Sequence, residues 1–294
     1  MKIFITGGSG LIGQYLNIEL SKTNTILTQY YTHIGNCDRF QSIRTSIIDY
    51  NTISKIFDEF KPDLVIHTAS VSNAEKADQL PADDVYEINV NATQFLAEQC
   101  EKHKCKLIYF STDLVYAGYR GSFLKEDAKL IPISLYAETK LMGEVKIQQT
   151  FDNYLILRIA LQFGFGLNHS FTHFQKVYEE LKKGNEVKLF SDQFRSPLEL
   201  KETARMISEL VKKEIKKEVI NFGGSERLSR YELGEKLCEV TGFNKDLLIP
   251  ITMEEANAIY RVHDVSMNID KLKSYGIFPT SVFESIERIK DNHE

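Results

Sequence analysis

Short runs of β-branched and aromatic residues alternate with helical patterns through the first half of this 294-residue chain. The runs that predict strands are residues 2–6, 25–31, 44–48, 63–68, 106–110 and 154–159. The helical stretches between them are residues 11–21, 52–60, 83–102 and 135–150. The run from Asp63 to Ala69 is apolar without alternation, as is typical of a strand covered on both faces. Strands that alternate with helices predict βαβ units and a parallel sheet.

The pattern changes after about residue 164. Helical segments dominate, at residues 169–183, 201–217 and 229–241, and the only strand candidates are 187–190 and 219–222. No internal repeat or low-complexity linker separates the halves. We therefore expect the second half to form a smaller lobe that packs on the first, with a soft boundary between them.

A glycine-rich loop, Thr6-Gly-Gly-Ser-Gly-Leu-Ile-Gly13, follows the first strand and opens the first helix. Without Cβ atoms the backbone can approach a pyrophosphate, and the helix N-terminus presents N–H groups and partial positive charge. This context predicts a dinucleotide site on a Rossmann-type, doubly wound α/β sheet, with a tight strand–helix turn as the alternative. The residues expected to bind the cofactor here are Gly7, Gly10, Leu11, Ile12 and Gly13.

The residues after the second predicted strand bear on the choice of cofactor. An acidic residue there would bind the ribose 2′-OH of NAD and repel the 2′-phosphate of NADP. The chain has Tyr30-Tyr31-Thr32-His33 at this place. The missing carboxylate slightly favours NADP over NAD, with His33 or Arg39 as partners of the 2′-phosphate. Asp49, after the third predicted strand, could accept from the adenine amino group, and Asn51 is expected to cap the next helix.

A hydroxyl, a tyrosine and a lysine form the second candidate constellation. Thr112 (or Ser111) follows the strand at 106–110, and Tyr136 and Lys140 lie at i and i+4, on one face of a helix. A phenol, with a pKa of about 10, becomes a useful general acid when a cation lowers that value. We therefore predict that Thr112 binds a substrate oxygen while Tyr136 supplies the proton and Lys140 supports it. Chance occurrence of the Tyr–Lys spacing is the alternative.

Composition and charge narrow the classes of function. Hydrophobic residues make up 43% and charged residues 26%, and the net charge is -5, so nucleic acid is not the expected partner. No apolar stretch approaches the roughly 20 residues that a membrane span needs. The four cysteines lack zinc-type or CxxC spacing, which predicts reduced thiols in the cytoplasm. No metal site is predicted, because His169 and His173 are expected on a helix surface.

These residues resemble the extended, nucleotide-sugar-modifying branch of the short-chain dehydrogenase/reductase superfamily. Within it the chain is most similar to the dTDP-4-dehydrorhamnose reductase family. The stretches that carry the resemblance are the glycine loop, Ser111-Thr-Asp-Leu-Val-Tyr-Ala-Gly118, Tyr136-Ala-Glu-Thr-Lys-Leu-Met-Gly-Glu144 and Asp192-Gln-Phe-Arg-Ser-Pro197. A weaker match covers Arg261, residues 264–268 and residues 271–272. The resemblance spans nearly the whole chain.

The resemblance implies roles for individual residues. Thr112, Tyr136 and Lys140 would form the catalytic trio, and Asn89 would either take part in catalysis or support loop geometry. Tyr136 and Lys140 would also contact the cofactor, together with Ala69 and Ser70. The residues implied on the substrate side are Ser111, Asp113, Val115 and Arg195, with Arg195 as the partner of a substrate diphosphate. Departures from the family pattern at Ser72, Ala117 and Val262 lie toward the substrate side and bear on the sugar specificity more than on the chemistry.

The function implied is reduction of a nucleotide-linked 4-keto-6-deoxy sugar by NADPH or NADH. Residues 1–164 would form the NAD(P)-binding Rossmann domain and residues 165–294 mostly a substrate-binding lobe, from which some segments could return to the sheet. Two alternatives stay open: an epimerase or dehydratase with retained NAD, and a non-catalytic subunit like the regulatory beta subunit of methionine adenosyltransferase. A homodimer is compatible with the family.

Overall fold

The computed structural model describes residues 1–291 and has a parallel, seven-stranded sheet at its centre. The strands, from one edge to the other, are β11 (Glu218–Phe222), β6 (Tyr154–Ile159), β5 (Lys106–Thr112), β4 (Leu64–His67), β1 (Lys2–Thr6), β2 (Thr25–Tyr30) and β3 (Gln41–Arg44). The strand order reverses between β1 and β4, which are paired in parallel from Ile3↔Leu64 to Thr6↔His67. In sheets of this type, ligands bind at the carboxyl ends of the strands beside such a reversal.

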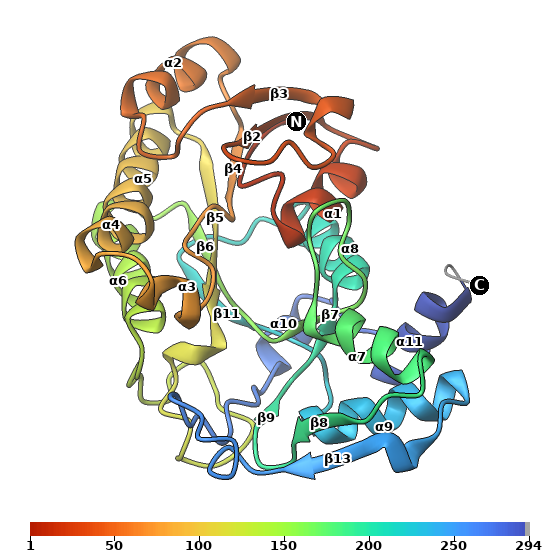
Figure 1. The fold of residues 1–294 in the computed structure, drawn as a ribbon. Coiled ribbons are helices and arrows are strands. Elements are labelled where there is room, and N and C mark those ends of the chain that lie inside the picture. Colours follow the sequence, from red (N-terminus) through yellow and green to blue (C-terminus); the bar gives the residue numbers. More distant parts are fainter. Residues whose placement is uncertain (292–294) are drawn as a thin grey trace.

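Helices cover both faces of the sheet (Figure 1). One face packs against α2 (Tyr50–Phe60), α5 (Ala92–His103) and α6 (Leu135–Thr150), with Phe57, Leu96 and Ile147 fully buried between the layers. The other face packs against α1 (Leu11–Leu20) and α8 (Leu200–Leu210). The predicted doubly wound α/β fold is confirmed.

The lobe has its own apolar core. The elements around this core, all from the second half of the chain, are α7 (His173–Lys182), α9 (Arg230–Thr241), α11 (Val282–Asp291) and the paired strands β8 (Val187–Phe190) and β13 (Leu248–Ile251). The remaining short elements are β7 (Gln162–Phe163), β9 (Phe194–Arg195), β10 (Leu198–Glu199), β12 (Leu228–Ser229), α3 (Ala74–Asp78), α4 (Ala82–Tyr86), α10 (Asp270–Ser274) and the 3₁₀ turns Cys37–Arg39, Asp113–Val115 and Lys245–Leu247. β11 and α8, from the second half, pack with the first half, and the division at residue 164 stays a prediction.

Three predicted elements differ from the structure. The third strand is β3 at Gln41–Arg44, whereas 44–48 was expected, because pairing with β2 along an exposed sheet edge selects a polar segment that the pattern does not mark. The helix expected at 83–102 is divided into α4, a π-helical turn at Glu87–Asn91 and α5. The helix expected from 169 begins at His173, where Thr172 accepts a cap hydrogen bond from Gln175.

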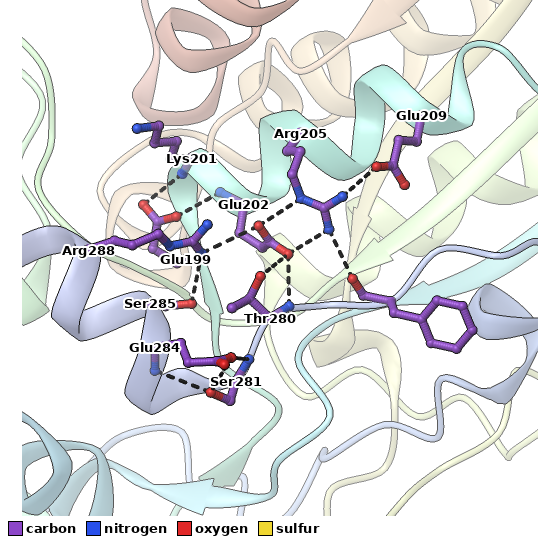
Figure 2. A network of polar contacts seen from close by, with 11 residues as sticks. Glu199, Lys201, Glu202, Arg205, Glu209, Thr280, Ser281, Glu284, Ser285 and Arg288 are labelled. Carbon is purple, nitrogen blue, oxygen red and sulfur yellow. Dashed lines mark hydrogen bonds and ion pairs between the residues drawn. The ribbon is translucent and has the colours of Figure 1, made fainter.

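A network of carboxylates and arginines joins α8 to α11 and to the segment before it (Figure 2). Glu199 caps α8 by accepting from the backbone N–H groups of Lys201 and Glu202. The fully buried carboxylate of Glu202 accepts from Arg205, from Arg288 on α11 and from both the backbone and the hydroxyl of Thr280. These contacts attach the lobe to the helix that covers the sheet.

The start of α9 offers a test of local stability. Ser229 accepts from the Glu232 backbone at 3.0 Å, and Glu232 accepts from the Ser229 backbone at 2.6 Å, so the two form a capping box. Ser229→Ala removes the first of these bonds, and we expect it to lower the free energy of unfolding by about 1 kcal/mol. Urea denaturation measures it, with Ser208→Ala inside α8 as the control. Equal losses in both variants would contradict this account.

Candidate active site

The glycine loop lies between β1 and α1, at the reversal of strand order. Gly7 has φ +68, and a Cβ there would lie 2.7 Å from the Ala69 backbone nitrogen; a Cβ on Gly13 would lie 2.2 Å from the Gly7 carbonyl oxygen. The Gln29 side chain accepts from the Gly7 N–H at 2.9 Å, and its backbone carbonyl accepts from Gly8 at 2.8 Å. Gly10, the N-cap residue of α1, offers no side chain to the first-turn N–H groups. Gly7 and Gly13 are thus required by the tight packing of the turn itself, which places the N-terminus of α1 at the end of β1, as in a pyrophosphate-binding loop.

The other predicted cofactor residues lie in three places. Ala69 contacts Gly7, and Ser70 follows it in the loop after β4, so both adjoin the glycine loop. His33 lies in the exposed segment after β2 and stacks on His169 of the second half, with ring centroids 4.6 Å apart. Asp49 caps α2 and accepts from the Thr52 N–H at 3.1 Å and hydroxyl at 2.7 Å, which lowers its pKa. The expectation that Asn51 caps this helix was therefore wrong.

The structure brings Thr112 and Tyr136 together. Thr112 ends β5, and Tyr136 lies in the first turn of α6, which Ser134 caps by accepting from Ala137. Burial raises the pKa of Tyr136 to about 12, a hydrogen bond with Thr112 lowers it, Asp113 raises it and Arg195 lowers it. The lowered phenol pKa that we expected is therefore not found, because burial outweighs the hydrogen bond with Thr112 and the charge of Arg195. The phenol is held in its protonated, proton-donating form.

Lys140 lies one turn along α6 from Tyr136 and is 2% exposed. Its Nζ is 4.1 Å from the centroid of the Tyr109 ring. Burial lowers the pKa of Lys140 to about 7, and the carboxylate of Glu144 opposes this effect. The ammonium therefore changes its charge near neutral pH, in contrast to an exposed lysine.

Asp113 and Arg195 form a buried ion pair, with Arg195 Nη1 2.6 Å from Asp113 Oδ1. Arg230, at the start of α9, donates to Gln193 Oε1 at 3.3 Å. Burial and, to a smaller extent, repulsion from Arg195 lower the pKa of Arg230 to about 10, and the charge of Asp113 opposes this shift. Two arginines and one carboxylate thus give the lobe side of the site a net positive charge, which suits an anionic ligand.

Sequence reasoning missed Arg230. It reaches this cluster because β12 pairs antiparallel with β9, joining Leu228 to Arg195. Strands of two residues give no recognisable pattern, so the chain offered no usable signal for the contact.

Two residues expected on the substrate side lie elsewhere. Val115 is fully buried in an apolar cluster with Tyr116, Val265 and Met267. The Ser111 hydroxyl donates to Glu144, whereas its neighbour Thr112 meets Tyr136. Their assignment to substrate binding remains a prediction that this arrangement does not support.

Asn89 is fixed between a loop and a helix. Its side chain accepts from the Val71 N–H at 2.8 Å and donates to the Val71 carbonyl at 3.2 Å and to the Thr139 hydroxyl at 3.0 Å. Since its amide is occupied by these bonds, the structure favours support of loop geometry over a catalytic role. It lies in the π-helical turn at Glu87–Asn91, and such turns are frequent at functional sites.

Some features are absent from residues 1–291. Their His, Cys, Asp and Glu side chains nowhere gather in a group of three that could hold a metal ion. None of their helices is long and apolar enough to cross a bilayer. All four cysteines are buried free thiols.

The fold and this site define a member of the extended short-chain dehydrogenase/reductase superfamily, as the sequence predicted. A family model described as the RmlD substrate binding domain matches residues 1–292, and the chain belongs to that family.

Similar proteins include a methionine adenosyltransferase subunit and dTDP-4-dehydrorhamnose reductases. The methionine adenosyltransferase 2 subunit beta of Pongo abelii is 23% identical over 94% of this chain and 83% of the relative. A dTDP-4-dehydrorhamnose reductase of Aggregatibacter actinomycetemcomitans is 28% identical over 76% of this chain and 71% of its own. The crystal structure of the dTDP-4-dehydrorhamnose reductase of Bacillus anthracis in complex with NADP has a TM-score of 0.85 at 22% identity, covering 99% of this chain and 98% of that one.

Proposed function

We propose that the protein is an NAD(P)H-dependent reductase of a nucleotide-linked 4-keto-6-deoxy sugar. The observation that carries this proposal is the contact between Thr112 and a protonated Tyr136, beside the strand reversal where the glycine loop lies. The similarity to dTDP-4-dehydrorhamnose reductases supports the substrate class. The cytoplasm remains the predicted compartment, and a homodimer the predicted assembly.

The glycine loop fits a nicotinamide dinucleotide, because its glycines allow a tight turn that leads from the end of β1 to the N-terminus of α1, where backbone N–H groups can bind a pyrophosphate. When bound, the dinucleotide would supply hydride to the carbonyl carbon. Thr112 would orient the carbonyl oxygen, and Tyr136 would donate its phenolic proton to that oxygen. Lys140 would hold the nicotinamide ribose, and Arg195 with Arg230 would attract the diphosphate of the substrate.

The test is a panel of nucleotide-linked keto-sugars offered to the purified protein with NADPH and NADH side by side. We expect a 4-keto-6-deoxy sugar on a nucleoside diphosphate to drive net oxidation of the cofactor. The loss of the near-ultraviolet absorbance of NADPH or NADH measures this oxidation. The lack of a carboxylate after β2 predicts that NADPH serves at least as well as NADH. Tight copurifying NAD with product formed but no net cofactor consumption would instead indicate an epimerase or dehydratase.

A second candidate is a non-catalytic, dinucleotide-binding subunit. It is favoured by the similarity, over 94% of this chain, to a methionine adenosyltransferase subunit beta. Stable copurification with an enzyme whose activity changes in its presence, without turnover of any keto-sugar, would establish this role in place of the reductase.

A further inference from the structure

A buried carboxylate lies one turn beyond Lys140 on α6. Glu144 is 2% exposed, and the (i, i+4) spacing puts it on the helix face that carries Lys140, with Tyr136 a further turn away. A carboxylate is rarely buried without a partner, because removing its charge from water is costly. Its contacts therefore indicate what it does there.

Arg158 on β6 holds Glu144 through two bonds. Arg158 Nε donates to Glu144 Oε1 at 3.1 Å and Nη2 donates to Oε2 at 2.9 Å. The Ser111 hydroxyl donates to the same Oε1. The carboxylate is thereby fixed in one orientation by side chains of two neighbouring strands, Ser111 on β5 and Arg158 on β6.

Arg158 is itself held by further hydrogen bonds. Its Nη1 donates to the Tyr116 hydroxyl at 2.9 Å and to the Glu126 carbonyl at 2.8 Å. The Tyr116 hydroxyl in turn donates to Asn221 Oδ1 at 2.6 Å, on β11. The side chains of this cluster, from Ser111 to Asn221, are all buried, so its geometry is set by the core and not by solvent.

The groups around Lys140 offer little other charge. Tyr109 on β5 presents its ring, and Tyr136 on the same helix is a protonated phenol. His67 on β4 is buried and bonded at both nitrogens, to Thr6 and Thr93, and burial together with Lys140 keeps its pKa well below the usual value. Glu144 is the described residue whose negative charge raises the pKa of Lys140.

We propose that Glu144 is a positioning residue that stabilises the charged form of Lys140, with Ser111 and Arg158 holding the carboxylate for this role. The inference deepens the proposed reductase function, in which Lys140 must be an ammonium group to support Tyr136 and the ribose. It also gives Ser111 a role that differs from the substrate contact expected from the sequence.

The direct test is a titration of Lys140 by NMR in protein carrying ¹³C-labelled lysine, assigned by comparison with Lys140→Met. In Glu144→Gln, a variant of matched size, we expect the pKa of Lys140 to fall by about one unit or more, because the substitution removes the opposite charge that favours the ammonium form. An unchanged Lys140 pKa would overturn the proposal.

Activity gives an independent readout. In Glu144→Gln, the alkaline limb of the pH–kcat profile should move to lower pH by the same amount, so that turnover is reduced about tenfold or more at pH 8 and approaches that of the wild type only near about pH 5. A merely structural role would reduce turnover equally at all pH values. Tyr116→Phe, which alters the same cluster without removing its charge, is the control and should leave the limb in place.

Glu144→Gln leaves Arg158 without its anion, so the variant could fail to fold. The charge-balanced double variant Glu144→Gln/Arg158→Gln removes both charges and should still lower the pKa of Lys140, because Glu144, and not Arg158, is the charge that acts on the ammonium. An unshifted pKa in a folded double variant would also reject the proposal. The titration needs no turnover, so its outcome does not depend on whether the protein is a reductase.

Discussion

Replacing Tyr136 with phenylalanine should lower kcat by about 10²- to 10⁴-fold and leave KM nearly unchanged. This range is what a positioned general acid contributes. The substitution removes one hydroxyl and keeps the ring, so the packing of α6 against its neighbours is preserved. Because the Tyr136 pKa of about 12 keeps the phenol protonated at neutral pH, its loss removes the proton donor itself. Steady-state kinetics with the keto-sugar identified from the panel would measure the change.

Tyr86→Phe is the matched control for this experiment. Tyr86 lies in α4 and donates its hydroxyl to Glu138, which is exposed on α6. The same atom is thus removed from a tyrosine that touches the same helix but not Thr112. Turnover of Tyr86→Phe should match that of the wild type. If Tyr136→Phe and the wild type oxidised NADPH at the same rate, the assignment of the proton donor would be rejected.

The pKa values of Tyr136 and Lys140 indicate which of the two residues causes the pH dependence of activity. The phenol does not ionise near neutral pH, whereas the pKa of Lys140 is about 7 because of burial. Activity that falls between about pH 6 and 8 in the wild type would therefore report the loss of the Lys140 charge. This is why the position of the alkaline limb, rather than the maximum rate, tests the role of Glu144.

Local patterns predicted the elements whose stability is local. The bounds of β1, β6 and α6 agree with the sequence, since each is a continuous apolar run or is capped by its own neighbours, as Ser134 caps α6. The edge strand β3 was misplaced because its residues are polar and only pairing with β2 makes them a strand. The π-helical turn in the helix before β5 follows from tertiary contacts of Asn89, for which spacing alone gives no sign.

The candidate site shows the same division. The glycine loop and the pair Tyr136 and Lys140 could be predicted because each lies within one short segment. The partners that set their electrostatics come from elsewhere: Arg230 through the pairing of β9 with β12, and Arg158 through the packing of β6 against α6. Glu144 has the helical spacing that would have placed it beside Lys140, but only its buried partners distinguish it from a surface residue.

Among the substitutions considered, Glu202→Gln should cause the largest loss of stability, because Glu202 joins α8 to α11 and to the segment before it. Its side chain is fully buried, and it accepts from Arg205 at 2.7 Å and from the Thr280 hydroxyl at 2.8 Å. Burial raises the pKa of this carboxyl, but the hydrogen bonds from Arg205 and Thr280 outweigh it and bring the pKa to about 2. Glu202→Gln should lower the free energy of unfolding by about 3 kcal/mol at pH 7, since each unit of pKa shift corresponds to about 1.4 kcal/mol and buried ion pairs are costly to break. Urea denaturation followed by circular dichroism measures the loss.

Glu209→Gln provides the matched control. Glu209 accepts from the same Arg205 but is 37% exposed. An exposed pair contributes little, so this variant should differ from the wild type by less than about 1 kcal/mol. Similar losses in the two variants would show that contact with Arg205, and not burial of the carboxylate, determines the energy.

The dependence of the Glu202 effect on pH distinguishes charge from shape. The pKa of Glu202 is about 2 in the folded protein, below the value near 4.3 of an unfolded glutamate, so the folded state binds fewer protons. Its contribution to stability is therefore fully present above about pH 5 and is lost as the pH falls toward 2. The difference between wild type and Glu202→Gln should shrink steadily in denaturation curves recorded at about pH 7, 5, 4 and 3. A difference that stayed constant over this range would mean that the packing of the side chain, and not its negative charge, attaches the lobe to α8.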